Sequence, residues 1–413
     1  MTLELVLRGA RIAGAEADAP PMDIGIAGGR IAAIEPEIGA AGGADTLDLN
    51  GRLVSAGLVE THIHLDKSRI IDRCAPAAAR ARDHMERVSA VKPEFTVEDV
   101  HARAAETLEQ SILNGVTHMR THVEVDPNVG LRGFEALQQL AADYAWAVDL
   151  ELCVFAQEGW TNAPETDRNV VAALERGAAV VGGAPAYDPD HAGQIRRIFE
   201  LAIAYDRDID IHLDVGPTAD DMDIDLVCDL TDRHGYGGRV AIGHGTKYSL
   251  LPPARLRALG ERLASAGVAV TVLPATDLFV TGRHQDHAVV RGVADANALI
   301  ECGANCSLST NNVLNPFTPF GDGSLLRIAN LYANVVQRGN EDELTECFEM
   351  LTRRSARLLR HDDYGIEVGR PADLVVWNAR SPAQAVATIA LPLHGFKRGR
   401  RTFSRSLPRL NRP

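Results

Sequence analysis

The histidines at positions 62 and 64 have the residue type and the spacing to bind a metal ion. They follow an apolar run, residues 53–59, that is typical of a short buried strand. Residues two apart in a strand point to the same face, so both imidazoles would lie on one side at the end of this strand. Neutral imidazole is a common ligand of zinc, iron and other first-row metals. By itself such a pair is as often two unrelated polar residues, so the positions of the other polar residues must decide.

The elements that would position this pair alternate between strands and helices. Helical periodicity occupies residues 97–113, 133–144, 167–176, 193–205, 226–234 and 253–266. Apolar strand candidates separate these segments, and eight β-α repeats in a row predict a parallel (β/α)8 barrel of the TIM type, an α/β fold. The predicted strands are 53–62, 115–122, 150–155, 179–183, 208–213, 239–244, 268–273 and 305–309.

The two ends of the chain predict a second, smaller unit. Residues 1–55 contain short apolar runs divided by Gly and Pro, and residues 363–413 contain a similar run at 372–377. We expect both ends to pair into one small composite β-sandwich. The barrel would then occupy residues 56–362.

Polar side chains cluster where the predicted strands end. Active sites of such barrels are built from the residues at the C-terminal ends of the strands. A cluster at one rim therefore predicts a single site. The residues concerned are His62, His64, His122, Gln157, His212, His244, Asn311 and Asn312.

Composition limits the possible partners. The formal net charge is −14, which argues against nucleic acid as a partner. The basic stretch 397–401 is interpreted as a solvated chain end. Six scattered cysteines without a CxxC pair predict reduced thiols, and no apolar run reaches membrane-spanning length. We therefore expect a cytoplasmic protein that acts on a small molecule and contacts no membrane.

At this point the chain resembles a known family. Residues 61–68, 121–123, 155–159, 312–321 and 365–376 are similar to segments of the amidohydrolase superfamily, in particular its cytosine deaminase branch, which also contains s-triazine (N-alkylammelide) amidohydrolases. The resemblance implies one divalent metal ion per chain, with zinc favoured and iron or manganese as alternatives. The ion would be held by His62, His64 and His212, with position 311 as a further ligand. Barrel enzymes of this kind are often symmetric homo-oligomers.

The resemblance also implies a reaction and residue roles. The expected reaction is hydrolysis of a C–N bond of a small nitrogen heterocycle, most simply a deamination. Hydrolysis of a cyclic amide or of an N-alkylamino substituent is the alternative. His244 would contact the attacking water or the developing tetrahedral centre, and Gln157 would hydrogen-bond a ring amide or carbonyl. Lys67, His122 and Asn312 are the further candidates for substrate contacts.

Two positions depart from the family pattern. Asn311 stands where the family has an aspartate that serves as metal ligand and proton shuttle, and Val215 stands where cytosine deaminases carry a glutamate. An amide oxygen coordinates a metal weakly and cannot accept a proton at neutral pH. Four explanations stay open: another base, a reaction needing less proton transfer, ligand binding without hydrolysis, or an engineered change at residue 311, which would leave Val215 unexplained. The candidate bases are Asp66, Glu158, Asp214, His244 and Asp277.

Overall fold

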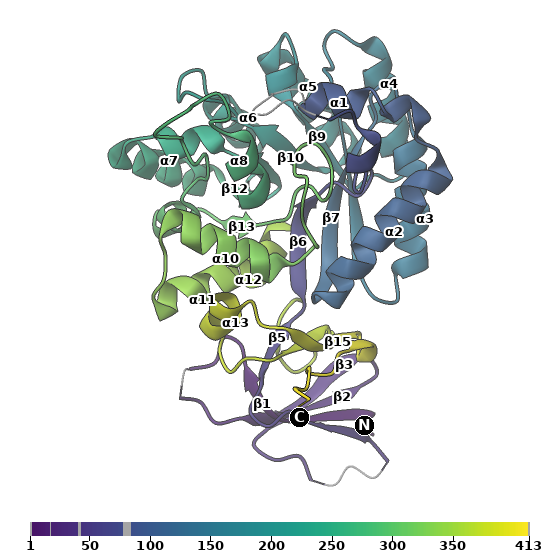
Figure 1. Cartoon of the computed structure of the whole chain (residues 1–413), viewed down its shortest axis with the longest axis vertical. Coiled ribbons are helices and arrows are strands. Elements are labelled where there is room, and N and C mark those ends of the chain that lie inside the picture. The colour runs from purple at the N-terminus through teal and green to yellow at the C-terminus, as the bar shows by residue number, and fades with distance from the viewer. Residues whose placement is uncertain (1, 17, 40–42, 77–83, 412–413) are drawn as a thin grey trace.

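Eight parallel strands from the middle of the chain form the predicted (β/α)8 barrel (Figure 1). The computed structural model describes residues 2–16, 18–39, 43–76 and 84–411. Neighbouring strands along the sheet pair in parallel from β6 to β13. The strands are β6 (Leu58–Ile63), β7 (Val116–Glu124), β8 (Asp149–Phe155), β9 (Val180–Gly183), β10 (Asp208–Leu213), β11 (Val240–His244), β12 (Val268–Val272) and β13 (Cys306–Leu308).

Helices connect the strands and cover the outside of the barrel (Figure 1). The first long helix begins where the Thr96 side chain accepts a hydrogen bond from the Asp99 amide, which satisfies a free N–H of the first turn. The helices are α1 (His84–Ser89), α2 (Val97–Leu113), α3 (Arg132–Tyr144), α4 (Pro164–Glu175), α5 (His191–Tyr205), α6 (Ile224–His234), α7 (Pro253–Ala266), α8 (Pro274–Val280), α9 (Ala296–Glu301), α10 (Leu325–Val336), α11 (Glu341–Glu349), α12 (Arg353–Leu358) and α13 (Pro382–Thr388).

Strands from both ends of the chain share a second sheet, which lies at one end of the barrel in Figure 1. Its order is β16-β15-β14-β5-β1-β2-β3, and β4 pairs with β1. The two ends meet where β14 pairs antiparallel with β5. The strands are β1 (Leu5–Ile12), β2 (Met22–Ala27), β3 (Arg30–Glu35), β4 (Asp45–Asp48), β5 (Leu53–Ala56), β14 (Leu374–Trp377), β15 (Pro392–Lys397) and β16 (Arg400–Ser404).

Gly57 divides the segment that the sequence predicts as one strand. Residues 53–56 form β5 in the terminal sheet and residues 58–63 form β6 in the barrel, so the prediction of a continuous strand 53–62 is wrong. A Cβ atom at position 57 would lie 2.1 Å from Oγ1 of Thr117 on β7. Only glycine therefore fits where the chain passes from one sheet to the other.

The basic stretch 397–401 is not a solvated chain end. It lies in β15, β16 and the turn between them, and Lys397 is buried. The Lys397 ammonium lies 2.7 Å from carboxylate oxygens of both Asp149 and Asp373. Paired carboxylates allow this charge to be buried between the barrel and the terminal sheet, and sequence spacing gave no sign of them. Among the described residues, no helix is long and apolar enough to cross a membrane.

Candidate metal centre and active-site cavity

Three imidazoles converge inside the C-terminal end of the barrel. The Nε2 atom of His212, from β10, lies 3.1 Å from Nε2 of His62 and 3.1 Å from Nε2 of His64. All three side chains are buried, and burial is the largest cause that lowers their pKa, to about 3 for His62 and well below the ordinary value for the other two. The imidazoles are therefore neutral at physiological pH, which is the form that binds metals.

The hydrogen bond of the His212 ring leaves its Nε2 atom available to bind a metal ion. Nδ1 of His212 lies 3.2 Å from the carbonyl oxygen of Gly183, a group that only accepts, so the ring proton sits on Nδ1 and Nε2 carries a lone pair. Nitrogens about 2.0–2.1 Å from one tetrahedral zinc ion are about 3.3 Å apart, close to the spacing found here. A cation between the three rings would be bound by the lone pair of His212 Nε2 and by those of the two neighbouring imidazoles. The three imidazoles that the sequence predicts as ligands thus have a spacing that suits one divalent metal ion.

A buried carboxylate supports the ring of His62 from behind. Oδ1 of Asp210 lies 3.7 Å from Nδ1 of His62 and 3.4 Å from Nε2 of His122, and Oδ2 accepts a hydrogen bond of 3.0 Å from Arg120. His122 also stacks on His62, with ring centroids 3.7 Å apart. His122 is completely buried and does not line the cavity described below, so this position does not favour the expected substrate contact.

Sequence reasoning missed Asp210, although a signal was present. Asp210 precedes His212 by two residues on one strand, so both side chains point into the barrel. Gly243 on β11 makes room beside them, because a Cβ atom there would lie 2.8 Å from Cε1 of His62. Close packing of this kind fixes the orientation of the ring, which sequence spacing alone does not reveal.

A cavity of about 320 Å³ opens above the imidazoles. One part of its wall carries polar groups, and another part is formed by small and apolar residues such as Ala184, Val215, Pro217 and Val280. Seven of the predicted site residues line it, namely His64, Lys67, Gln157, His212, His244, Asn311 and Asn312. Such a volume suits one small ligand.

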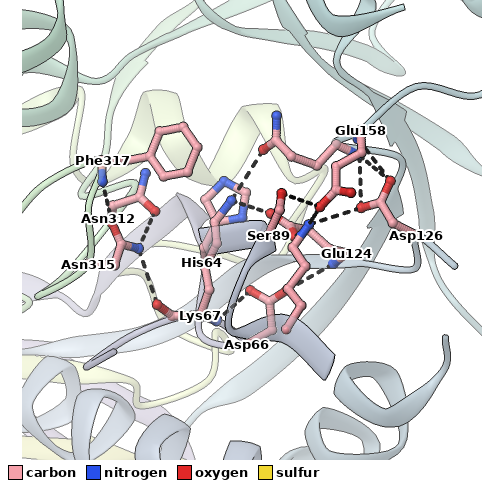
Figure 2. Close-up of polar contacts among 12 residues, drawn as sticks. His64, Asp66, Lys67, Ser89, Glu124, Asp126, Glu158, Asn312, Asn315 and Phe317 are labelled. Carbon is pink, nitrogen blue, oxygen red and sulfur yellow. Dashed lines mark hydrogen bonds and ion pairs between the residues drawn. The ribbon is translucent and has the colours of Figure 1, made fainter. Parts of the chain in front are cut away.

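Lys67 belongs to a buried network of charges at one side of the cavity. Its ammonium lies 2.5 Å from Oε1 of Glu124 and donates a hydrogen bond of 3.3 Å to Oε1 of Gln157. Lys92, which sequence reasoning missed, contacts Glu124 from the other side and lies 2.5 Å from Glu158. Figure 2 shows the connected contacts of this network beside His64. Although burial opposes it, the two ammonium groups lower the pKa of Glu124 to about 2, so this carboxylate is ionised.

His244 is paired with a buried carboxylate. Its Nδ1 atom lies 2.5 Å from Oδ1 of Asp277, and Oδ2 of Asp277 accepts a hydrogen bond from the Leu273 amide. Nε2 of His244 points to the other side and lies 3.5 Å from Nδ2 of Asn311. Asp277 is thus a partner of His244 and does not itself line the cavity.

Asn311 joins the two edges of the barrel sheet. Its backbone N–H donates to the carbonyl of His62, and its carbonyl accepts from the N–H of His64, at 2.9 and 2.8 Å. The φ angle of Asn311 is 62°, a left-handed conformation that asparagine and aspartate tolerate better than most residues. Position 311 therefore lies beside His62 and His64 because of its backbone conformation, which asparagine and aspartate both tolerate.

The carboxylates proposed as alternative bases do not reach the cavity. Asp66 accepts hydrogen bonds from the Lys67 and Glu124 amides, and Asp214 accepts from the Asp223 amide and the Tyr248 hydroxyl. Among the described residues that line the cavity there is no aspartate or glutamate. His244 is the one member of the candidate set of bases that does line it.

Comparisons with known proteins agree with this geometry. Residues 135–403 match the model of the amidohydrolase family. The chain is 29% identical to the N-isopropylammelide isopropyl amidohydrolase of Pseudomonas sp. (strain ADP), over 92% of each chain.

Two solved structures are also similar. The 5-methylcytosine deaminase of Klebsiella pneumoniae, in complex with 5-fluorocytosine, is 28% identical with a TM-score of 0.92, over 99% of each chain. The N-isopropylammelide isopropylaminohydrolase of Burkholderia multivorans ATCC 17616 is 27% identical with a TM-score of 0.85, over 97% of this chain and 98% of that one.

Proposed function

Because this chain belongs to the amidohydrolase family, we propose that it is a metal-dependent hydrolase that removes an amine from a small nitrogen heterocycle, as a cytosine deaminase-like aminohydrolase. One observation carries the proposal: three neutral imidazoles meet with Nε2 of His212 3.1 Å from Nε2 of both His62 and His64, and His64 and His212 line a cavity of about 320 Å³. The similarity to a 5-methylcytosine deaminase and to two N-isopropylammelide hydrolases supports the substrate class.

We propose that His62, His64 and His212 hold one divalent ion, with zinc as the first choice. Imidazole nitrogen suits zinc and also iron, whereas manganese, the third candidate, prefers oxygen ligands, so the ligand type limits the metal without fixing it. A bound divalent cation of this kind lowers the pKa of a coordinated water from 15.7 to about 7 and makes hydroxide available at neutral pH. Asp210 orients His62 by facing its Nδ1 atom.

Gln157 and Lys67 would orient the heterocycle. Oε1 of Gln157 accepts a hydrogen bond from Lys67, so the Nε2 group of Gln157 is left to donate to a ring carbonyl or ring nitrogen. Lys67 is itself held by Glu124, which fixes the position of the Gln157 amide. Holding the reacting ring carbon in one orientation lowers the entropic cost of reaching the transition state.

His244 would carry the proton. Asp277 accepts a hydrogen bond from Nδ1 of His244, which leaves Nε2 as the proton acceptor on the side of Asn311. In this role His244 takes a proton from the attacking water and returns it to the departing amine. Asp277 would act as a positioning residue that fixes the tautomer of the ring.

The cavity wall after β10 favours a second candidate reaction. Val215, Gly216 and Pro217 line this wall, with Val215 where cytosine deaminases carry a glutamate. An apolar wall near the metal ligand His212 suits an alkyl group on the departing amine. Hydrolysis of an N-alkylamino substituent, as in the names of two of the relatives, is therefore the alternative.

The test is amine release by purified, metal-loaded protein. The substrates are cytosine, 5-methylcytosine and an N-isopropylamino-triazine, and ammonia and isopropylamine are measured separately. Ammonia from the pyrimidines supports the deaminase, and isopropylamine from the triazine supports the alternative. A metal-loaded protein that binds these rings without releasing any amine would refute both reactions and would indicate a binding protein. The cytoplasmic location and the homo-oligomer expected from the sequence stay predictions.

A further inference from the structure

Three buried asparagines form a chain of hydrogen bonds that ends beside the metal centre. Nδ2 of Asn315 donates to Oδ1 of Asn312 at 2.7 Å, and Nδ2 of Asn312 donates to Oδ1 of Asn311 at 2.9 Å. All three side chains are buried, so a polar group that loses its partner costs stability. Because an amide nitrogen only donates and an amide oxygen only accepts, the direction of one amide dictates the direction of the next.

The backbone fixes the direction of the chain at Asn315. Its Oδ1 atom accepts hydrogen bonds from the backbone N–H groups of Phe317 and Thr318, at 2.9 and 3.2 Å. Its Nδ2 group donates to the backbone carbonyl of Lys67 at 3.2 Å as well as to Asn312 (Figure 2). Reversing the Asn315 amide would place N–H against N–H and oxygen against oxygen, and buried polar groups would lose their partners.

His244 fixes the same direction from the opposite end. The carboxylate of Asp277 accepts from Nδ1 of His244 and from the Leu273 amide, so the ring proton lies on Nδ1. Nε2 of His244 therefore offers a lone pair to its neighbour Asn311, whose Nδ2 lies 3.5 Å away. Two independent anchors thus require Asn311 to turn its nitrogen toward His244 and its oxygen toward Asn312.

We infer that Asn311 serves the site as a fixed N–H donor and is not a metal ligand, an inference that rests on the proposed metal-dependent function. Asparagine offers an N–H donor at this position, where an aspartate would offer a second acceptor oxygen. In the resting site this donor faces the lone pair of Nε2 of His244. Once His244 has taken up a proton there, the donor is released and is positioned to stabilise negative charge that develops on the substrate. Removing such a donor typically lowers kcat by about 100- to 1000-fold.

Metal affinity separates a donor from a ligand, because only a ligand contributes to it directly. The experiment measures zinc affinity by competition with a coloured chelator, and coordination by the absorption spectrum of the cobalt form. Asn311→Gly is the first variant, since glycine accepts the left-handed φ of this position. If Asn311 is a donor, the Asn311→Gly variant should keep a metal affinity within about threefold of the wild type and an unchanged cobalt spectrum. Its kcat should fall by about 100-fold or more.

The second variant reverses the direction of the chain. An aspartate at position 312 still accepts from Asn315 but cannot donate, so Asn311 would turn its nitrogen to residue 312 and its oxygen to the metal centre. Asn312→Asp should therefore raise metal affinity at least tenfold and change the cobalt spectrum. The double variant N311G/N312D controls for the added charge, and it should keep no more than a threefold gain.

The outcomes distinguish this inference from the proposed function. A tenfold loss of metal affinity in N311G, or an equal gain for N312D in both backgrounds, would overturn the inference and leave the function intact. A wild-type protein that takes up no metal would refute the proposed function and the inference with it. If N312D does not fold, Asn311→Asp replaces it: a tenfold gain in metal affinity supports the inference, and an unchanged affinity means that an oxygen ligand was already present.

Discussion

Replacing Asp210 with asparagine tests whether the metal centre depends on a residue that touches no substrate. Asp210 lies behind His62, and its second oxygen is held by Arg120. Burial disfavours its charge, but the contacts of Asp210 with His122, His62 and Arg120 hold the pKa of Asp210 well below its ordinary value. The carboxylate is thus ionised, and its negative charge, 3.7 Å from Nδ1, favours His62 as a ligand of a cation.

The size of the effect follows from this geometry. Removing an outer carboxylate typically lowers metal affinity by about 10- to 100-fold, which corresponds to about 1.4–2.8 kcal/mol. Asparagine has nearly the same shape, so no cavity forms. Arg120 keeps a second carboxylate, Glu151, at 2.6 Å, so its buried charge stays paired in the Asp210→Asn variant. We therefore expect a folded protein with a weakened metal site.

The assay compares unfolding with and without metal. At saturating metal, binding stabilises the native state by RT ln(1 + [L]/Kd), so the difference between loaded and metal-free protein should shrink by the same 1.4–2.8 kcal/mol, about 10- to 100-fold in affinity. Glu151→Gln is the matched control, because Glu151 contacts Arg120 from a position that is partly exposed. This control should change metal affinity less than twofold. The reasoning fails if Asp210→Asn keeps wild-type affinity, or if the control loses as much.

Three further predictions concern substrate binding, stability and pH. Lys67→Met removes the donor that orients Gln157, so KM should rise about tenfold or more in steady-state kinetics; an unchanged KM would contradict the assigned role. Gly57→Ala should cost about 1–3 kcal/mol in urea unfolding, whereas Gly339→Ala, where nothing lies within 4 Å of the added atom, should stay within about 0.5 kcal/mol; equal losses would disprove the steric argument. Burial raises the pKa of Asp126 from 3.8 to about 6, so the native state binds more protons than the unfolded state in this window. This group therefore lowers stability as pH rises through it, by up to about 1.4 kcal/mol per pH unit, and urea unfolding of Asp126→Asn should lack that slope.

Local patterns in the sequence predicted the fold and the candidate metal ligands. The alternation of apolar strands with helical periodicity predicts the barrel, because each strand and helix shows its buried face in its own residues. His62 and His64 were identifiable as candidate ligands because a strand places alternate residues on one face. His212 and His244 followed from the rule that polar residues at strand ends meet at one rim.

Other parts of the site depend on residues distant in sequence. Lys92 reaches Glu124 from a short segment before α2, and Asp277 reaches His244 from the start of α8. The division of residues 53–63 between two sheets depends on Thr117, which leaves no space for a side chain at position 57. No characteristic spacing in the sequence reveals these contacts, because each depends on how separate elements pack.

The amide at position 311 shows most clearly what the sequence alone does not predict. The sequence by itself determined that this residue stands beside three imidazoles and that it cannot accept a proton as aspartate would. Only the tertiary structure decided which end of the amide faces the site, because that direction is set by backbone groups after Asn315 and by the carboxylate of Asp277. The physical reason is that hydrogen bonds have a polarity, and a buried chain of them passes the polarity of its ends to every member.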